Sequence, residues 1–413
     1  MLSAYRVLDL TDERGLLCGQ ILGDLSADVI KIEPPGGSPA RDIPPFFRDT
    51  PDRERSLFWW SYNRNKRAIT LDVEKADGRE ILLRLVRSAH FLIESEIPGQ
   101  MASFGLGYEA LRAINPGLIY VSITAFGQDG PKALYADADL IVMAAGGPLI
   151  LTGDEDRPPV RVSVAQGYLH ASADAAVGAM VANHERAVSG LGQHVDISAQ
   201  QSLAMATQSS ILAAAVGADQ IERMAGGVRV GLLRLPLVWP AKDGWVSCTF
   251  LFGSALGVFT RKLMHYICEH GYCDEATRDK DWLAYTELLL TGREPIAEYE
   301  RVIGIVSKFT AAHTKGELLR LAIDKGFLIA PITTMSEVID SEQLRAREYF
   351  QELPHPELGR AIRYPGPFVK FSESPIKYRR RPPSVGEHNR EIYCDELGMS
   401  ESTVAELSKR GII

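Results

Sequence analysis

Apolar residues in the first third of the chain form short β-rich runs that alternate with stretches of helical spacing. Amphipathic helices are predicted at 16–25 and 75–88, where apolar residues recur every three or four positions. Links between these elements are short. This alternation predicts an α/β fold, a doubly wound Rossmann-like parallel sheet with helices on both faces. The predicted strands lie at 5–10, 28–32, 68–71, 90–93 and 118–124.

The pattern changes twice farther along the chain. Long apolar segments at 170–187 and 199–216 predict helices that complete the first part. From about Leu232, a predicted hairpin around the turn KDGW (242–245) is followed by charge-rich helical segments. Strand character returns in GFLIAPI (326–332). We therefore predict a large domain at 1–220, a smaller middle domain at 221–325, and a return to the large domain at 326–413.

Composition narrows the class of protein. At 413 residues, with 24% charged and 46% hydrophobic residues, the chain has an ordinary globular composition. Its net charge of −8 argues against a nucleic-acid partner, because phosphate contacts need a basic excess. The five dispersed cysteines show no metal-ligand spacing, which favours a cytoplasmic protein without a bound metal. No apolar run reaches the roughly 18 residues of a membrane span, and no signal peptide is predicted.

Five blocks of the chain share their order and motifs with one known family. They are VLDLTDERGLLCGQILGDLSADVIKIEPPGGSPARD (7–42), NRNKRAITLDV (63–73), ESEIPGQMASFGLGYEALRAINPGLIYVSITAFGQDGP (94–131), ADADLIVMAAGG (136–147) and PPSVGEHNREI (382–392). Together they resemble the family III CoA-transferases, which include formyl-CoA, carnitine and benzylsuccinate CoA-transferases. The resemblance implies an enzyme that uses acyl-CoA, such as succinyl-CoA, and an organic acid. It also implies an interlocked-ring dimer.

A sixth segment, PPVRVSVAQGYLHASADAAVGAMVANHERAVSGLGQ (158–193), resembles the family's catalytic core. In the family pattern an Asp in this segment is the nucleophile that carries the acyl group. Counting forward from Pro158 and backward from Gln193 both place that Asp on Tyr168, with no gap on either side. The chain thus keeps the frame but lacks the carboxylate. His170 lies two residues away, and either a general base or a packed histidine is compatible with it.

CoA carries a 3′-phosphate and a pyrophosphate, which need cations and backbone N–H donors. Asn65, Lys66 and Arg67 precede a predicted strand, and Pro98 and Gly99 follow one. The resemblance implies that these residues contact CoA at the carboxyl edge of the sheet, with Arg41 as a further candidate. Without the resemblance, Lys66 and Arg67 would be interpreted as a solvated turn.

The chain departs from the family pattern around the same region. Glu96 stands where the family has an aromatic residue, and its carboxylate would repel phosphate. Ser103 replaces an Arg, and Met143 replaces a Gln. The pocket has therefore changed in several places, not only at Tyr168.

Three hypotheses follow from the missing carboxylate. The chain is a subunit of a heteromeric CoA-transferase whose homologous partner carries the catalytic Asp. Alternatively, it is an isomerase, racemase or lyase of CoA thioesters that uses Tyr168, His170 or Asp12. The third possibility is a homo-oligomeric transferase with a relocated carboxylate. We favour the first, because several linked losses suggest that the catalytic work is done by a partner.

Overall fold

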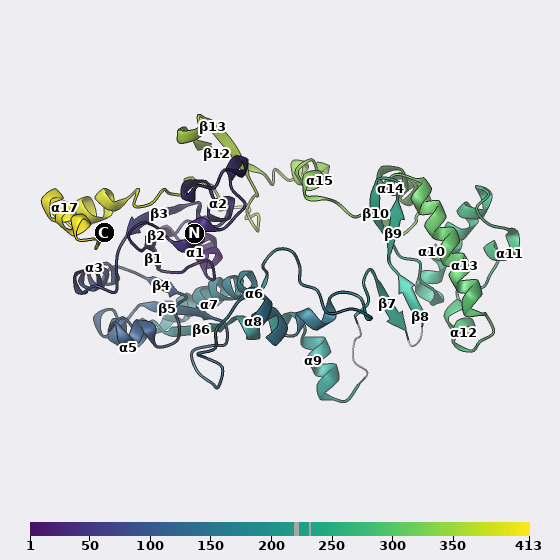
Figure 1. Cartoon of the computed structure of the whole chain (residues 1–413), viewed down its shortest axis with the longest axis horizontal. Coiled ribbons are helices and arrows are strands. Elements are labelled where there is room, and N and C mark those ends of the chain that lie inside the picture. Colours follow the sequence, from purple (N-terminus) through teal and green to yellow (C-terminus); the bar gives the residue numbers. More distant parts are fainter. Residues whose placement is uncertain (219–222, 231–232) are drawn as a thin grey trace. The chain divides into compact units, whose positions relative to one another are not determined.

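The computed structural model describes residues 1–218, 223–230 and 233–413 (Figure 1). They form two compact units. The large unit comprises Met1–Ile150, Arg161–Gln220 and Gln343–Ile413, and the small unit comprises Leu151–Val160 and Ile221–Glu342.

The large unit is built on a six-stranded sheet of order β3-β2-β1-β4-β5-β6. Every neighbouring pair in it is parallel. Because the strands are parallel, their carboxyl ends share one edge, which we call the carboxyl edge. The predicted parallel sheet of an α/β fold is confirmed. Its strands are β1 (Arg6–Asp9), β2 (Asp28–Glu33), β3 (Lys66–Thr70), β4 (Phe91–Glu94), β5 (Ile119–Thr124) and β6 (His194–Ser198).

Helices cover both faces of this sheet (Figure 1). Alternate strand residues point to opposite faces, so Val7 packs with α1 (Leu16–Asp24) and α7 (Gly167–Ser189). Its neighbour Leu8 packs on the other face with α3 (Ala76–Val86), α5 (Tyr108–Ile114) and the last residues of the chain. The remaining helices of the large unit are α2 (Leu57–Asn63), α4 (Gln100–Ser103), α6 (Asp139–Ala145), α8 (Ala199–Ala206), α9 (Gln208–Ala215) and α17 (Glu401–Lys409), and a hairpin of β12 (Gln351–His355) and β13 (Arg360–Tyr364) accompanies them.

Small residues on α7 allow close packing against the sheet and α1. Ala171, Ala175 and Ala179 are fully buried in the core of this face. At Gly178, an added Cβ would lie 2.9 Å from the side chain of Val195 on β6, so the helix could not approach that strand as closely with a larger residue. The Ala/Gly-rich pattern of the sequence is therefore a packing surface.

The small unit has a separate core around a three-stranded antiparallel sheet of order β11-β10-β9. The predicted hairpin is confirmed as β9 (Val238–Ala241) and β10 (Gly244–Cys248). The strands β7 (Gly227–Val230) and β8 (Leu233–Pro236) pair antiparallel in a separate two-stranded sheet. The helices of this unit are α10 (Gly253–Glu269), α11 (Glu275–Arg278), α12 (Tyr285–Leu290), α13 (Ile296–Ala312), α14 (Lys315–Lys325) and α15 (Met335–Ile339), and α16 (Glu342–Ala346) lies at the boundary with the large unit.

The strand at the end of the middle segment differs from the expectation. We expected the chain to return to the large domain at 326, but β11 (Ile329–Pro331) pairs with β10 in the small unit. The small unit accordingly extends to Glu342. A short apolar run shows that a strand forms, but not which sheet it joins, because pairing depends on residues distant in sequence.

Candidate functional site at the carboxyl edge

The sheet of the large unit has a topological switch point between β1 and β4. From β1, strands β2 and β3 extend to one side, whereas β4, β5 and β6 extend to the other. Ligands of doubly wound sheets bind outside the carboxyl ends of the strands at such a point. The loop after β1 brings Asp12 and Arg14 to this position, and the residues after β4 bring Ser95 and Glu96.

Five side chains meet at the switch point and form what we call the switch-point cluster: Asp12, Arg14, Ser95, Asp137 and Tyr168. Ser95 Oγ donates to Asp12 Oδ1 at 2.8 Å and accepts from the Asp12 backbone N–H at 2.9 Å. Arg14 donates to both carboxylate oxygens of Asp12. Its Nη2 lies 2.6 Å from Oδ2, and its Nε lies 2.9 Å from Oδ1. It also forms an ion pair with Asp137 at 3.4 Å. Burial acts to raise the pKa of Asp12. The hydrogen bonds and positive charge of Arg14 outweigh the effect of burial and hold this pKa below its ordinary value.

Tyr168 lies in the first turn of α7 and is 9% exposed. Its hydroxyl is buried and has no hydrogen-bond partner among the described residues. Burial, followed by the nearby Asp137 carboxylate, raises the pKa of the phenol, which is therefore neutral at physiological pH. The backbone N–H groups of Gln166 and Gly167, at the start of α7, both donate to Asp139 Oδ1 at 2.7 Å.

A pocket of about 500 Å³ opens at the carboxyl ends of β1 to β4, and we call it the edge pocket. Four carboxylates line it, from Glu33, Asp72, Glu74 and Glu96, and no basic side chain occurs among the described lining residues. Burial and the Asp12 carboxylate raise the pKa of Glu96, with a smaller contribution from Glu74. The pocket at the expected ligand edge is thus acidic.

Pro98 and Gly99 lie at the carboxyl edge, after β4, as the sequence predicts. Gly99 has a left-handed φ of 88° and would have open space around an added Cβ. It lines a second pocket of about 420 Å³ together with Glu94, whose side chain is 3% exposed. Burial raises the pKa of Glu94 to about 7, although Ser122 and the Glu96 backbone N–H stabilise the carboxylate.

The structure places Asn65, Lys66 and Arg67 at the opposite edge of the sheet from the predicted one. β3 begins at Lys66, so these residues lie at its amino end. The Lys66 ammonium is buried and donates to Asp9 Oδ2 at 2.8 Å, the Leu16 carbonyl at 2.9 Å and Asn63 Oδ1 at 3.0 Å. All three of its N–H donors are therefore used within the protein.

Asn65 and Arg67 connect the sheet to the C-terminal segment. The Asn65 side-chain oxygen accepts from the Arg379 backbone N–H at 2.7 Å. Arg67 forms ion pairs with Asp28 at 2.6 Å and Glu391 at 2.8 Å, and with Glu396. Through these contacts the side chains of the NKR run hold distant parts of the chain together.

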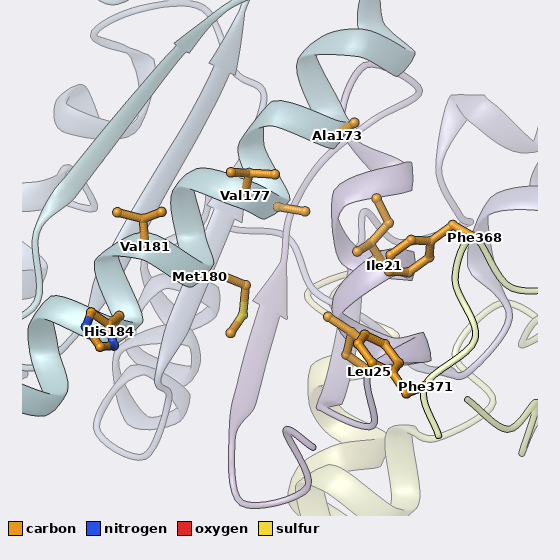
Figure 2. A pocket seen from close by; sticks show the side chains of 10 residues that line it. Ile21, Leu25, Ala173, Val177, Met180, Val181, His184, Phe368 and Phe371 are labelled. Carbon is orange, nitrogen blue, oxygen red and sulfur yellow. The ribbon is translucent and has the colours of Figure 1, made fainter. Parts of the chain in front are cut away.

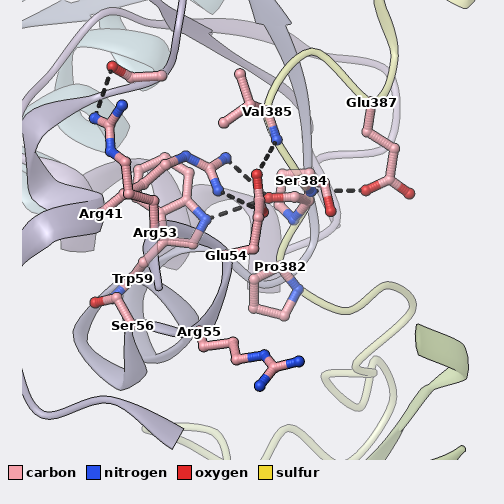
Figure 3. Close-up of polar contacts among 12 residues, drawn as sticks. Arg41, Arg53, Glu54, Arg55, Ser56, Trp59, Pro382, Ser384, Val385 and Glu387 are labelled. Carbon is pink, nitrogen blue, oxygen red and sulfur yellow. Dashed lines mark hydrogen bonds and ion pairs between the residues drawn. The ribbon is translucent and has the colours of Figure 1, made fainter. Parts of the chain in front are cut away.

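Arg41 is also enclosed by protein groups (Figure 3). Its guanidinium forms two hydrogen bonds to Glu33, at 2.7 Å and 2.8 Å, and one to Glu54 at 3.0 Å. It donates to the Pro383 carbonyl and lies 3.9 Å from the centroid of the Trp59 ring. Glu54 in turn accepts from the Val385 backbone N–H at 3.0 Å. Arg41 is therefore fully buried, and its guanidinium is bonded to protein oxygens.

His170 does not join the switch-point cluster. His170 is exposed on α7, whereas Tyr168 lies on the buried face of that helix, in the core. Sequence reasoning missed Ser95 and Asp137 as members of the cluster. Ser95 follows a strand directly, which is a usable signal, but nothing in the sequence places Asp137 beside a residue 31 positions later.

In the described part of the chain, no helix is long and apolar enough to cross a membrane. Within the same residues, no group of three or more His, Cys, Asp or Glu side chains is arranged to hold a metal ion.

Comparison with known proteins places the chain in a family. The model of "CoA-transferase family III" matches residues 2–389. The chain is 32% identical to the succinyl-CoA:(R)-benzylsuccinate CoA-transferase subunit BbsE of Thauera aromatica, over all of this chain and 98% of that protein. It is 31% identical to the succinyl-CoA–D-citramalate CoA-transferase of Chloroflexus aurantiacus, again over all of this chain and 98% of the relative.

A solved structure extends the comparison to the fold. The crystal structure of a CAIB/BAIF family protein from Brucella suis superposes with a TM-score of 0.80 and 28% identity, covering 95% of this chain and 98% of that one. The six-stranded parallel sheet, the motif blocks and the full-length matches agree. The chain belongs to the family III CoA-transferases.

Proposed function

We propose that this chain is a subunit of a CoA-transferase that moves CoA from an acyl-CoA such as succinyl-CoA to an organic acid. A homologous partner subunit supplies the nucleophilic carboxylate. The observation that carries the proposal is the buried, neutral hydroxyl of Tyr168, the residue that sequence spacing predicts at the family's Asp position. Support for the donor comes from relatives whose names include succinyl-CoA, and one of them is named as a subunit.

The reaction explains why the side chain at this position matters. A carboxylate attacks the thioester carbonyl, the C–S bond breaks, and CoA leaves as a thiolate while a mixed anhydride forms. The thiolate attacks the enzyme-side carbonyl of the anhydride, releases the donor acid as its carboxylate and leaves CoA as a thioester on the enzyme carboxyl group. The acceptor carboxylate attacks this thioester, expels the thiolate and forms a second mixed anhydride. Attack of the thiolate on the acceptor carbonyl then gives the new acyl-CoA and regenerates the enzyme carboxylate. Tyr168 cannot start this sequence, because its phenol is protonated and would give an aryl ester instead of an anhydride.

An apolar groove on the large unit supports an association with another chain (Figure 2). It has a volume of about 570 Å³ and lies between α1, α7 and the segment that carries Phe368 and Phe371. Val177 and Val181 on α7 are each 63% exposed along it. Exposed apolar patches of this kind are characteristic of protein–protein contacts. We propose that the partner subunit covers this face.

Co-expression with a homologous chain that carries Asp at the position of Tyr168 tests the proposal. We expect the two chains to co-purify and to transfer CoA from succinyl-CoA to an acid, with neither active alone. Transfer by this chain alone at a rate matching the complex would refute the heteromer. Replacing the partner's Asp by Asn serves as the matched control and should abolish transfer by the complex.

The same complex tests whether Tyr168 acts chemically. Tyr168→Phe removes only the hydroxyl, which lies near Asp137. We expect turnover to change less than about twofold, because the neutral phenol does not act as the nucleophile. A loss of about 100-fold or more would instead favour the isomerase, racemase or lyase alternative, in which Tyr168 is the acid or base.

A relocated carboxylate is a second candidate, and Asp137 is the residue that favours it. Asp137 pairs with Arg14 beside Tyr168 and is partly exposed at the switch point. In a homo-oligomer, Asp137 would attack the thioester in place of the family Asp. Hydroxylamine trapping with succinyl-CoA would then modify Asp137, and Asp137→Asn would remove both the adduct and the transfer activity. An unmodified Asp137 in a chain that is active alone would exclude it.

A further inference from the structure

We infer that the edge pocket of this chain excludes the nucleotide half of CoA, so that a complex with its partner binds one CoA per pair of subunits. The inference rests on the proposed function and deepens it, because it assigns CoA binding as well as nucleophilic attack to the partner. The residues that act as the barrier are Glu74 and Glu96.

The four carboxylates of the edge pocket are not equally balanced by cations. Glu33 is neutralised by two hydrogen bonds from buried Arg41. Asp72 forms an ion pair with Lys75 at 3.2 Å. Glu74 and Glu96 have no ion-pair partner among the residues that the structure describes, and both line the pocket. The charges of Arg14 and Lys31 act to lower the pKa of Glu96, but neither cation forms an ion pair with it. The pocket therefore presents two carboxylates that no ion pair neutralises.

These charges lie where a doubly wound sheet receives a phosphorylated ligand. The pocket is bounded by the residues that follow β1, β2, β3 and β4, at the carboxyl edge. It has room for a ligand, since its volume of about 500 Å³ falls within the ordinary range of small-molecule sites. Space is thus not the obstacle. A 3′-phosphate or pyrophosphate in this pocket would face like charge at close range, which disfavours binding.

The cations near this pocket are bonded to other protein groups. Arg14 pairs with Asp12 and Asp137, and Lys31 donates to Asp9 and to the Thr11 carbonyl. Lys66, Arg67 and Arg41 use their donors on protein carboxylates and carbonyls. Lys75, the cation bonded to Asp72, donates its remaining bonds to the carbonyls of Arg410 and Gly411. Recruiting any of them to a phosphate would break an existing set of contacts. The acidic character of the pocket is therefore built into the surrounding structure.

Equilibrium binding of adenosine 3′,5′-bisphosphate to the full chain tests the inference. We expect the natural chain to bind it no more tightly than about 1 mM, and Glu74→Gln/Glu96→Gln to bind at least about tenfold more tightly. Both side chains are polar and at least partly exposed, so the substitutions should not disturb folding. The matched control is Glu80→Gln/Glu406→Gln, which removes two exposed carboxylates elsewhere and should leave binding unchanged.

The direction in which affinity changes with salt concentration distinguishes repulsion from attraction. Ordinary phosphate sites weaken as salt rises, whereas screened repulsion should make the natural chain bind more tightly between about 0.02 M and 0.5 M salt. The variant should lose this increase. Micromolar binding by the natural chain, or a variant that binds no better than it, would overturn the inference.

Stoichiometry in the co-purified complex completes the test. Titration with CoA should saturate at one CoA per two chains, and saturation at two would contradict the inference. Failure here is separable from failure of the proposed function, because the binding experiments need no transfer activity. A complex that transfers CoA but binds two molecules would retain the proposed function and remove only the inference.

Discussion

The basic and acidic side chains of the large unit are distributed in opposite ways. At the amino end of β3 and around Arg41, the cations are buried and bonded to protein oxygens. At the carboxyl edge, Glu74, Glu94 and Glu96 lack ion-pair partners among the described residues. The comparison teaches that the cations of the NKR run are bonded within the fold, while carboxylates without an ion-pair partner set the charge of the open edge.

The largest expected effect comes from removing one of the buried cations, Lys66. Lys66→Met would leave Asp9 fully buried with only Lys31, at 3.3 Å, to balance it. Removing one partner of a buried ion pair destabilises a protein by about 3–5 kcal/mol. Hydrogen exchange of the β1 and β3 amides measures the opening free energy of this region. Lys132→Met, at an exposed position, is the control. Equal losses of opening free energy in the two variants would contradict a stabilising role for the buried Lys66–Asp9 ion pair.

An intermediate effect is expected on the acidic side at Glu94. Its folded pKa of about 7 lies above the ordinary value, so the unfolded chain loses this proton first and folding loses stability as pH rises from about 4.5 to 7. Glu94→Gln removes that loss. We expect it to stabilise the protein by about 1–3 kcal/mol at pH 8 and by little at pH 4.5.

Thermal unfolding at the two pH values measures the effect of Glu94→Gln. Glu109→Gln is a suitable control, because Glu109 lines the same pocket and the substitution removes the same charge. A stabilisation that is equal at pH 4.5 and pH 8 would show that ionisation of Glu94 is not its cause.

The smallest effect is expected at Arg14, the cation that does lie at the switch point. Arg14→Met removes the group that holds the pKa of Asp12 low. A carboxyl with a depressed folded pKa stabilises the fold above its unfolded pKa, and that stability disappears as pH falls through the folded value. We expect a loss of about 1 kcal/mol at pH 7 that begins to shrink only below about pH 4, as Asp12 of the natural folded chain becomes protonated. A pH-independent loss would instead indicate lost packing.

Local patterns were sufficient for much of the fold. The strand and helix runs of the first third, the hairpin near Trp239 and the parallel sheet follow from periodicities of two and of three to four residues. The position of Tyr168 in the family frame also came from sequence spacing alone. The sheet joined by β11 could not be obtained this way, because a three-residue strand carries no information about its partner.

The candidate site, like the fold, could be predicted from the sequence only in part. The sequence by itself predicted the family, which the comparisons show, and it carries the prediction that Tyr168 stands at the position of the family Asp. Only the tertiary structure decided that Lys66 is sealed against Asp9, 57 residues away, and that Asp137 and Arg14 surround Tyr168. The physical reason is that charge balance is a property of distances in space. Residue types fix which charges a chain carries, whereas folding decides which of them neutralise one another and which face a ligand.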